Sequence, residues 1–142
     1  MNTVPDKNAA VTARNLTVAY GSRVIQSGLS FTIKKGDIFI IMGGSGCGKS
    51  SLLRVLMGLT PPAEGSVFYG ETDFWAAPRK KRENIMRRTG VMFQSGALWT
   101  SRTLAENVAL PLEYYTSLSP RDIRALASFK LSLVGLAGFE DF

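Results

Sequence analysis

A glycine-rich stretch at residues 43–50, with the sequence GGSGCGKS, constrains the fold of this chain more than any other feature. It matches the pattern G-x-x-x-x-G-K-[ST] at every required position. The apolar run at residues 37–42 is typical of a buried parallel strand, and residues 51–57 carry apolar side chains at helical spacing. A strand, a glycine loop and a helix in this order predict a phosphate-binding loop (P-loop), because glycines let backbone N–H groups turn inward and the helix N-terminus is electropositive.

The motif also predicts how a nucleoside triphosphate would be held. Lys49 would reach the β- and γ-phosphates, and the Ser50 hydroxyl would hold Mg²⁺. The other residues expected around the phosphates are Gly43, Gly44, Ser45, Gly46, Cys47, Gly48 and Ser51. The alternative, a glycine turn that only joins a strand to a helix, is disfavoured by the complete match and its context.

Length and composition place the chain among globular proteins. Its 142 residues suffice for one domain with a hydrophobic core, and 45% of them are hydrophobic and 20% charged. No apolar run approaches the roughly 20 residues that cross a bilayer, so we expect no transmembrane helix. The polar start, residues 1–11, lacks the apolar core of a secretory signal. A single cysteine, Cys47, excludes an internal disulfide and favours a reducing compartment.

Much of the net charge of +6 lies in a basic run at residues 79–88, in a short helix expected after Pro78. A solvated helix face is the simpler interpretation, and proximity to an anionic membrane surface is the alternative. The chain has no recognisable nucleic-acid motif and no interleaved aromatic platform, so we expect no nucleic-acid partner.

Alternation and turn residues predict the remaining strands. Residues 13–33 favour antiparallel strands joined at Tyr20-Gly21-Ser22, residues 66–69 a short strand, and residues 89–94 a second buried strand. The helix after the P-loop should bury one face, formed by Leu52, Val55, Leu56 and Leu59.

Capping patterns predict two further helices. One begins at Thr103, whose Thr-x-x-Glu spacing is that of a capping box, and Pro111 should end or bend it. The other begins at Ser119, which Pro120 follows at the first helical position. Their apolar stripes are expected to be Leu104, Val108 and Leu112 in the first, and Ile123, Leu126, Ala127 and Leu131 in the second.

Taken together, these motifs resemble the ATP-binding subunit of an ABC transporter. Tyr20 stands upstream of the P-loop beside a turn, residues 56–67 are similar to the family's exit from the P-loop helix, and residues 91–94 match the strand that delivers the Q-loop glutamine. The resemblance implies that Tyr20 stacks on adenine and that Gln94 meets the metal or its water.

A narrower resemblance lies in residues 94–99, Gln-Ser-Gly-Ala-Leu-Trp, and in residues 103–112. They are similar to the Mla-type, MCE-associated branch, whose members drive phospholipid movement between the membranes of Gram-negative bacteria. In that branch an aromatic residue, commonly Phe, stands where this chain has Trp99. The alternative is that Ala97, Leu98 and Trp99 only pack the helical subdomain.

The resemblance implies an α/β fold: a P-loop NTPase core of the ABC ATPase type, an antiparallel β portion and the start of a helical subdomain. The expected parts are a polar N-terminal tail (1–12), the antiparallel β portion with the nucleotide-binding core (13–94), and the Q-loop with the start of the helical subdomain (95–142). The chain has no histidine, no Leu-Ser-Gly-Gly-Gln signature and no apolar strand ending in Asp-Glu. We therefore expect a truncated domain, poorly stable and without appreciable ATP hydrolysis alone.

The resemblance also implies ligands and partners. ATP and Mg²⁺ are the expected cofactors, with Lys49 and Gln94 as catalytic residues and Ser50 and Gln94 at the metal. The expected partners are a membrane permease, contacted by residues 95–118, and a second ATP-binding subunit. The subunit would be peripheral to the cytoplasmic face of the bacterial inner membrane.

Three other functions are alternatives to this one. Another ABC importer or exporter would share every motif except the narrow branch similarity. A P-loop kinase would leave the placement of Tyr20 and Gln94 without a purpose, and a GTPase would need an Asn-Lys-x-Asp guanine reader, which is absent. A non-enzymatic module that binds nucleotide or a permease is the third alternative.

Overall fold

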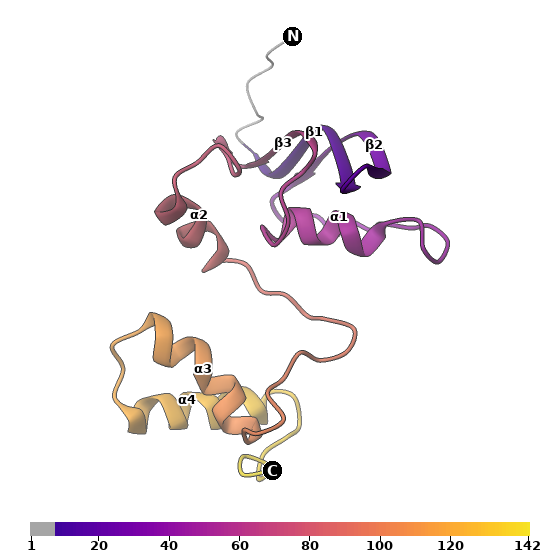
Figure 1. Ribbon diagram of the computed structural model, residues 1–142. Helices are drawn as coiled ribbons and strands as arrows, with labels where there is room; N and C mark the ends of the chain where they lie inside the picture. The colour runs from indigo at the N-terminus through magenta and orange to yellow at the C-terminus, as the bar shows by residue number, and fades with distance from the viewer. Residues whose placement is uncertain (1–7) are drawn as a thin grey trace. The chain divides into compact units, whose positions relative to one another are not determined.

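The computed structural model describes residues 8–142 and divides the chain into two compact units, residues 1–91 and 92–142, which are treated separately below (Figure 1). Residues 1–7 of the expected polar tail (1–12) lie outside the described residues. Residues 9–12 belong to the first strand, so the expected boundary after residue 12 is wrong. The elements are β1 (Ala9–Tyr20), β2 (Arg23–Lys34), α1 (Lys49–Leu56), β3 (Glu64–Tyr69), β4 (Thr72–Asp73), α2 (Arg79–Met86), α3 (Leu104–Tyr115) and α4 (Pro120–Ser132).

The first unit is built on a four-stranded antiparallel sheet with the order β2-β1-β3-β4. β1 is central: Ala13 pairs with Phe31 on one side and with Val67 on the other. The β1–β2 hairpin turns at Gly21, whose φ of 58° is the left-handed conformation that glycine adopts without strain. The antiparallel portion and the short strand expected at residues 66–69 are confirmed.

Helix α1 packs its apolar face on this sheet (Figure 1). The shared core consists of Ala13, Leu16, Val18, Leu52, Val55, Leu56 and Val67. The Tyr69 hydroxyl of β3 donates a hydrogen bond to the Leu56 carbonyl at the end of α1, and burial raises the pKa of this phenol, which keeps it a donor. Leu59, expected on the buried face, is 60% exposed, because α1 ends at Leu56 and Gly58 turns the chain with a φ of 71°.

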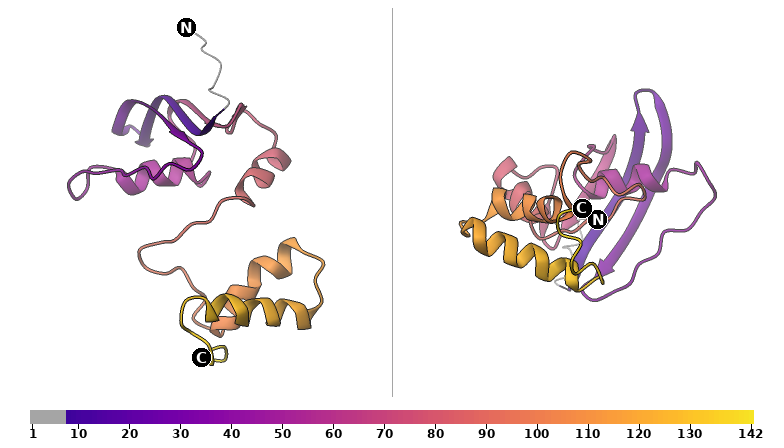
Figure 2. Two further views of the ribbon diagram at one scale, coloured as in Figure 1. Left: turned by 180° about the vertical axis from the view of Figure 1, so that it is seen from behind. Right: turned by 90° about the horizontal axis from the view of Figure 1, so that it is seen from below.

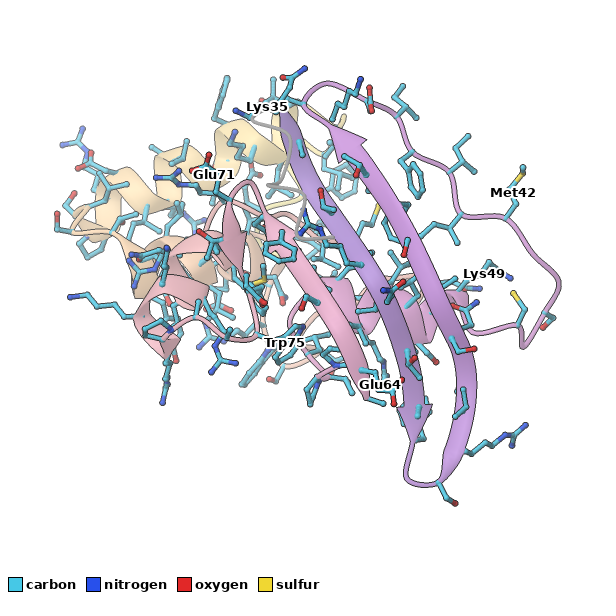
Figure 3. The ribbon with its side chains drawn as sticks, turned by 90° about the horizontal axis from the view of Figure 1, so that it is seen from above. Lys35, Met42, Lys49, Glu64, Glu71 and Trp75 are labelled. Atoms are coloured by element: carbon cyan, nitrogen blue, oxygen red, sulfur yellow. The ribbon has the colours of Figure 1, made fainter. Side chains whose placement is uncertain are left out.

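The buried parallel strand expected at residues 37–42 and the second buried strand expected at residues 89–94 are absent. Neither segment pairs with a strand of the described chain, and Met42 and Met92 are 86% and 97% exposed. Figure 3 shows the Met42 side chain pointing away from the sheet. A parallel strand is hydrogen-bonded to neighbouring strands of its sheet, and the described residues supply no pairing strand for either segment.

The segment before the P-loop nevertheless keeps the alternation of an extended chain. Phe39 stacks on Phe31 of β2 with ring centroids 5.1 Å apart, and Ile41 packs against the core. The intervening Ile38 and Ile40 point outward, with 92% and 70% exposure. The apolar run therefore covers one face only in part against the sheet, since Phe39 is still 44% exposed, and leaves the other face open.

The second unit is a pair of packed helices, α3 and α4 (Figure 2). Both predicted starts are confirmed: Thr103 and Glu106 form a complete capping box, and Ser119 caps α4 with Pro120 at the first helical position. Pro111 does not end α3, which continues to Tyr115. The buried side chains are Ala105, Ala109, Ile123, Ala127 and Leu131, whereas the expected α3 stripe (Leu104, Val108, Leu112) is only partly buried.

The C-terminal residues close the start of α3. The Leu104 N–H donates to the Phe142 carbonyl (2.7 Å), and the Ala105 N–H donates to the Glu140 carbonyl (3.0 Å). Arg124 of α4 binds both carboxylate oxygens of Asp141 at 2.8 and 3.1 Å, which raises the pKa of the guanidinium. Helix-terminal N–H groups are thereby satisfied by the chain itself.

The packing of the core in the first unit predicts how a core substitution changes the free energy of unfolding. Leu16 is fully buried between α1 and the sheet, so Leu16→Ala should lower the free energy of unfolding by about 2–5 kcal/mol. Val24→Ala is the matched control, because Val24 lies in the same hairpin but is 59% exposed, and it should change stability by less than about 0.5 kcal/mol. Urea unfolding measures both; equal losses would contradict this packing.

Candidate nucleotide-binding site

The P-loop lies between the extended residues 37–42 and helix α1. Gly46 and Gly48 have φ values of 77° and 97°, which side-chain-bearing residues rarely adopt. Gly48 caps α1, and a Cβ placed there would come within 2.5 Å of the Ile25 methyl group of β2. The tight approach of the loop to β2 thus requires glycine at this position.

Lys49 folds back over the loop that precedes it. Its ammonium donates hydrogen bonds to the carbonyls of Gly43 and Gly44, both at 2.7 Å, and lies 3.7 Å from the Cys47 sulfur. None of the ion pairs found among residues 8–142 involves this lysine. The positive charge is therefore fixed at the loop by neutral carbonyls and is not cancelled by a carboxylate.

The donor chemistry of the loop fits a polyphosphate. Within residues 43–48, the Cys47 N–H donates to the Gly44 carbonyl at a long 3.4 Å, while α1 starts with no acidic residue in its first turn. The first N–H groups of a helix have no partner inside the helix and attract anions. Amides, helix terminus and ammonium together form a positive, hydrogen-bond-donating loop.

The described residues offer few ligands for a divalent cation near the P-loop. The structure holds no cluster of three or more Cys, Asp or Glu residues among residues 8–142. Ser50 is exposed in the first turn of α1, and its hydroxyl is the kind of oxygen ligand that Mg²⁺ takes alongside phosphate oxygens. The residues present therefore fit a metal that arrives with its nucleotide.

Gln26 of β2 hydrogen-bonds to the P-loop through its side chain, a contact that the sequence did not predict. Its Nε2 donates to the Cys47 carbonyl at 2.8 Å, across 21 residues of sequence. Its Oε1 is buried and has no hydrogen-bond partner among the described residues. A glutamine in an amphipathic strand carries no local signal for such a contact, because the contact depends on how the hairpin and the loop pack.

Tyr20 lies at the same end of the hairpin as this brace. Gln26 pairs with Val18, two residues before Tyr20, and Tyr20 pairs with Arg23 at the turn. The tyrosine is 46% exposed, so part of its ring is open to solvent. The structure brings the strand that carries Tyr20 close to the P-loop, whereas stacking on adenine stays a prediction.

Gln94 belongs to the second unit, so its expected role at the metal also stays a prediction. It is exposed and lies in a turn closed by the Gly96 N–H on the Phe93 carbonyl (3.2 Å), and Gly96 and Ala97 have φ values of 82° and 62°. A left-handed alanine is unusual and stores backbone strain of about 1 kcal/mol.

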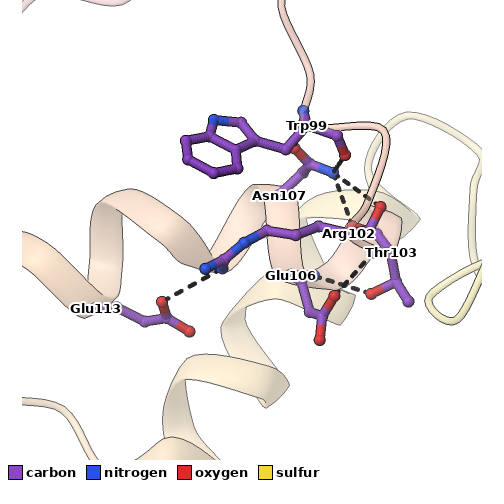
Figure 4. A network of polar contacts seen from close by, with 6 residues as sticks. All are labelled: Trp99, Arg102, Thr103, Glu106, Asn107 and Glu113. Atoms are coloured by element: carbon purple, nitrogen blue, oxygen red, sulfur yellow. Dashed lines mark hydrogen bonds and ion pairs between the residues drawn. The ribbon is translucent and has the colours of Figure 1, made fainter.

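Asn107 of α3 organises the loop after this turn (Figure 4). Its Oδ1 accepts from the Trp99 N–H at 2.8 Å, and its Nδ2 donates to the carbonyls of Trp99 (3.0 Å), Arg102 (3.2 Å) and Thr103 (3.0 Å). One carboxamide therefore fixes the backbone of residues 99–103. Sequence reasoning did not single out Asn107, although it lies directly beside the capping-box Glu106.

The same loop presents an exposed aromatic side chain. Trp99 is 59% exposed, and the Arg102 guanidinium carbon lies 5.6 Å from its ring centroid. Arg102 also reaches Glu113 of α3 at 3.8 Å (Figure 4). Leu98 beside it is 61% exposed. The alternative that these residues only pack the helical subdomain does not account for this exposure.

A glycine loop closed by its lysine at the start of a helix, on an antiparallel sheet, defines a P-loop protein. Comparison with models of known families gives a match over residues 26–141 to the ABC transporter family. Because the match covers most of the sequence, the chain belongs to the ABC transporter family.

Individual relatives agree with this assignment. The chain is 38% identical over 128 residues to the intermembrane phospholipid transport system ATP-binding protein MlaF of Haemophilus influenzae, covering 90% of this chain and 48% of that protein. The chain is 35% identical to MlaF of Escherichia coli K12, again covering 90% of this chain and 48% of that protein. The probable ribonucleotide transport ATP-binding protein mkl of Mycobacterium tuberculosis is 37% identical, covering 92% of this chain and 36% of that protein. The chain thus spans half or less of these relatives.

Solved structures confirm the fold. The ATP-binding cassette MJ0796, solved as a dimer in a post-hydrolysis state bound to ADP and Pi, superposes with a TM-score of 0.82 at 29% identity, covering 92% of this chain and 60% of that one. The cbiO1 protein of Clostridium perfringens superposes with a TM-score of 0.75 at 22% identity, covering 94% and 53%. In residues 8–142 no helix has the length and apolarity that crossing a membrane requires.

The hydrogen bonds of Asn107 predict how its substitution changes the order of the loop at residues 99–103. Asn107→Ala removes the acceptor of the Trp99 N–H, and a lost hydrogen bond of about 1.4 kcal/mol should speed its hydrogen exchange about tenfold. Asn84→Ala, on exposed helix α2, is the matched control and should leave this exchange unchanged. Unaltered exchange in Asn107→Ala, followed by NMR, would show that other contacts order the loop.

Proposed function

We propose that this chain provides the nucleotide-binding region of an ABC transporter ATP-binding subunit and binds Mg-ATP. The position of the Lys49 ammonium, 2.7 Å from two carbonyls of the glycine loop, is the observation that carries the proposal. It supports a site formed by the Lys49 ammonium, which no carboxylate neutralises, together with the loop amides and the N-terminus of α1.

Each residue has a distinct task in this proposal. Lys49 and the loop amides would stabilise the phosphate charge, and the Tyr20 ring would stack on adenine. Mg²⁺, when bound, neutralises phosphate charge, and Ser50 together with Gln94 would hold it and its water. Ser45, Cys47 and Ser51 complete the wall of the loop, and Gln26 keeps the loop at its distance from β2.

Hydrolysis is proposed for the complete subunit and not for this chain alone. Phosphoryl transfer depends on positioning and charge stabilisation, and the sequence lacks an Asp-Glu strand end, a signature loop and histidine. The P-loop accounts for phosphate binding only. A second ATP-binding subunit is proposed as a partner, supported by the dimeric structure of the similar cassette MJ0796.

Phospholipid is the proposed cargo, and a membrane permease is the proposed partner. The names of the MlaF relatives and the similarity of residues 94–99 to that branch support this choice. The subunit would then work at the cytoplasmic face of the bacterial inner membrane. A ribonucleotide cargo is the second candidate, because the mycobacterial relatives of nearly equal identity carry that name.

The nucleotide site is tested by calorimetry. Lys49→Ala should weaken Mg-ATP binding about 10- to 100-fold, as expected for the loss of a charged hydrogen-bond donor. Lys130→Ala, in the last turn of α4, is the control and should bind as the unaltered chain does. Gln26→Ala should weaken binding about fivefold, because the Cys47 carbonyl loses its brace.

Two results would contradict the proposal. Undiminished Mg-ATP binding by Lys49→Ala would remove the lysine from the site. Steady ATP turnover by the chain alone, abolished in Lys49→Ala, would show that the missing acids are not needed.

The exposed tryptophan tests the permease contact. In the complete subunit with its permease, Trp99→Ala should reduce transport far more than nucleotide binding, because Trp99 is 59% exposed on a loop of the second unit. Phe129→Ala, a comparably exposed aromatic residue on α4, is the control. Equal loss of transport and of Mg-ATP affinity in Trp99→Ala would assign Trp99 to the nucleotide site instead.

A further inference from the structure

The turn of the β1–β2 hairpin is followed by an arginine, Arg23, that takes no part in holding the fold together. Its side chain is exposed. None of the ion pairs and cation–π contacts found among residues 8–142 involves its guanidinium. The face of the hairpin on which Arg23 lies therefore decides what this cation is able to bind.

The strand register places Arg23 on the face of the hairpin that meets the P-loop. Arg23 pairs directly with Tyr20, and Gln26 pairs with Val18. Directly opposite residues of an antiparallel pair share a face, as do residues two apart in one strand. The register shift at this point adds one residue to β2 and leaves the alternation of β1 intact. Val18 is buried in the core that α1 shares with the sheet, so all four side chains lie on the face that carries α1.

Gln26 fixes the position of this face relative to the P-loop. Its Nε2 donates to the Cys47 carbonyl at 2.8 Å, and a Cβ placed on Gly48 would come within 3.3 Å of the Gln26 side chain. From Gln26 to Arg23 the strand advances by at most about 10 Å. A nucleotide whose phosphates lie on the P-loop thus has room for its ribose along this face, with its base beside the hairpin turn.

No acid of the neighbouring strand neutralises Arg23. Glu64 of β3 pairs with Thr17 and accepts a hydrogen bond from its hydroxyl at 3.3 Å. Thr17 directly precedes Val18, so the side chains of Thr17 and Glu64 point to the opposite face of the sheet from Arg23. The face that carries α1 therefore presents, at the hairpin turn, a cation beside the Tyr20 ring, which is 46% exposed.

A guanidinium beside a tyrosine ring suits the two flat faces of a nucleobase. The guanidinium is planar and stacks on aromatic faces, and proteins use both aromatic rings and arginine planes to stack on unpaired bases. The Cβ atoms of directly opposite residues in an antiparallel pair lie about 5 Å apart, so Tyr20 and Arg23 are close enough to touch one base. The Tyr20 ring covers one face of a base and leaves the other face open.

We propose that Arg23 is a base-binding residue, which stacks its guanidinium on the face of the nucleobase that Tyr20 leaves open. The inference rests on the proposed nucleotide site and adds a source of base specificity to it. Stacking grows with the size of the base and does not read its edges, so the pair favours purines over pyrimidines and treats adenine and guanine alike.

The experiment compares two ligands by calorimetry on the full chain: Mg-ATP, and Mg-tripolyphosphate, which has no base. Arg23→Gln should weaken Mg-ATP binding about three- to tenfold and leave Mg-tripolyphosphate binding unchanged. Arg23→Lys keeps the charge without the planar group and should lose nearly as much. Lys34→Gln is the matched control, because it removes one exposed cation from the other end of the same strand, and it should bind both ligands as the unaltered chain does.

The two ligands separate failure of this inference from failure of the nucleotide site. Equal losses on both ligands in Arg23→Gln, or full recovery in Arg23→Lys, would assign Arg23 to the phosphates by charge and overturn the proposal. Undiminished Mg-ATP binding in Arg23→Gln would overturn it too. If the unaltered chain binds Mg-tripolyphosphate as tightly as Mg-ATP, the base is not held, and the phosphate site stands without this inference. Binding of neither ligand would overturn the nucleotide site and the inference with it.

Two further measurements distinguish stacking from a structural role of Arg23. The unaltered chain should bind Mg-CTP about three- to tenfold more weakly than Mg-ATP or Mg-GTP, and Arg23→Gln should bring these affinities closer together. Equal affinities in the unaltered chain would overturn the proposal without any variant. The double variant Tyr20→Ala/Arg23→Gln should lose at least about twofold less Mg-ATP affinity than the product of the single losses, because both side chains hold the same base. Losses that simply multiply would show that the two side chains act separately.

Discussion

The packing of α1 on the antiparallel sheet is the interaction on which the P-loop depends. Val55 is fully buried in a core shared with Leu16 and Val67, and the Tyr69 hydroxyl holds the last turn of α1 through the Leu56 carbonyl. Because α1 is only eight residues long, fixing its C-terminal turn also fixes its N-terminus. The loop amides and Lys49 are therefore oriented by a hydrophobic contact that α1 makes along its length with the sheet.

A side-chain carboxamide holds the P-loop, and another holds the loop at residues 99–103. Gln26 binds the Cys47 carbonyl in the P-loop, and Asn107 binds backbone groups on both sides of the turn after Trp99. Residues 8–142 contain no disulfide and no cluster of potential metal ligands, so hydrogen bonds and side-chain packing order these loops. A carboxamide suits this task because it both donates and accepts without carrying charge, so Gln26 adds no charge beside the proposed phosphate site.

Local signals in the sequence predicted the turn of the hairpin, the P-loop position and the starts of both capped helices, because each of these depends on residues that are close in sequence. The strands at residues 37–42 and 89–94 were not predicted correctly. Their apolar runs require neighbouring strands, which a local pattern cannot supply. Gln26 and Asn107 were missed for a related reason: the Gln26 contact joins residues 21 apart, and Asn107 looks like any polar residue on a helix surface.

In the segment before the P-loop, residues 37–42, the alternation of the side chains and the pairing of the backbone depend on different interactions. Phe39 and Ile41 face the sheet while Ile38, Ile40 and Met42 face outward, so the side-chain alternation of a strand exists without its hydrogen bonds. Alternation follows from an extended backbone and one apolar surface to pack on, whereas a ladder needs a second backbone. The P-loop is therefore fixed at its helical end by α1 and Gln26, and at its other end by side-chain packing and by the two hydrogen bonds from Lys49, without strand pairing. Any element that covered the outward face and paired with this segment would order the Gly43 and Gly44 carbonyls, and with them the Lys49 ammonium.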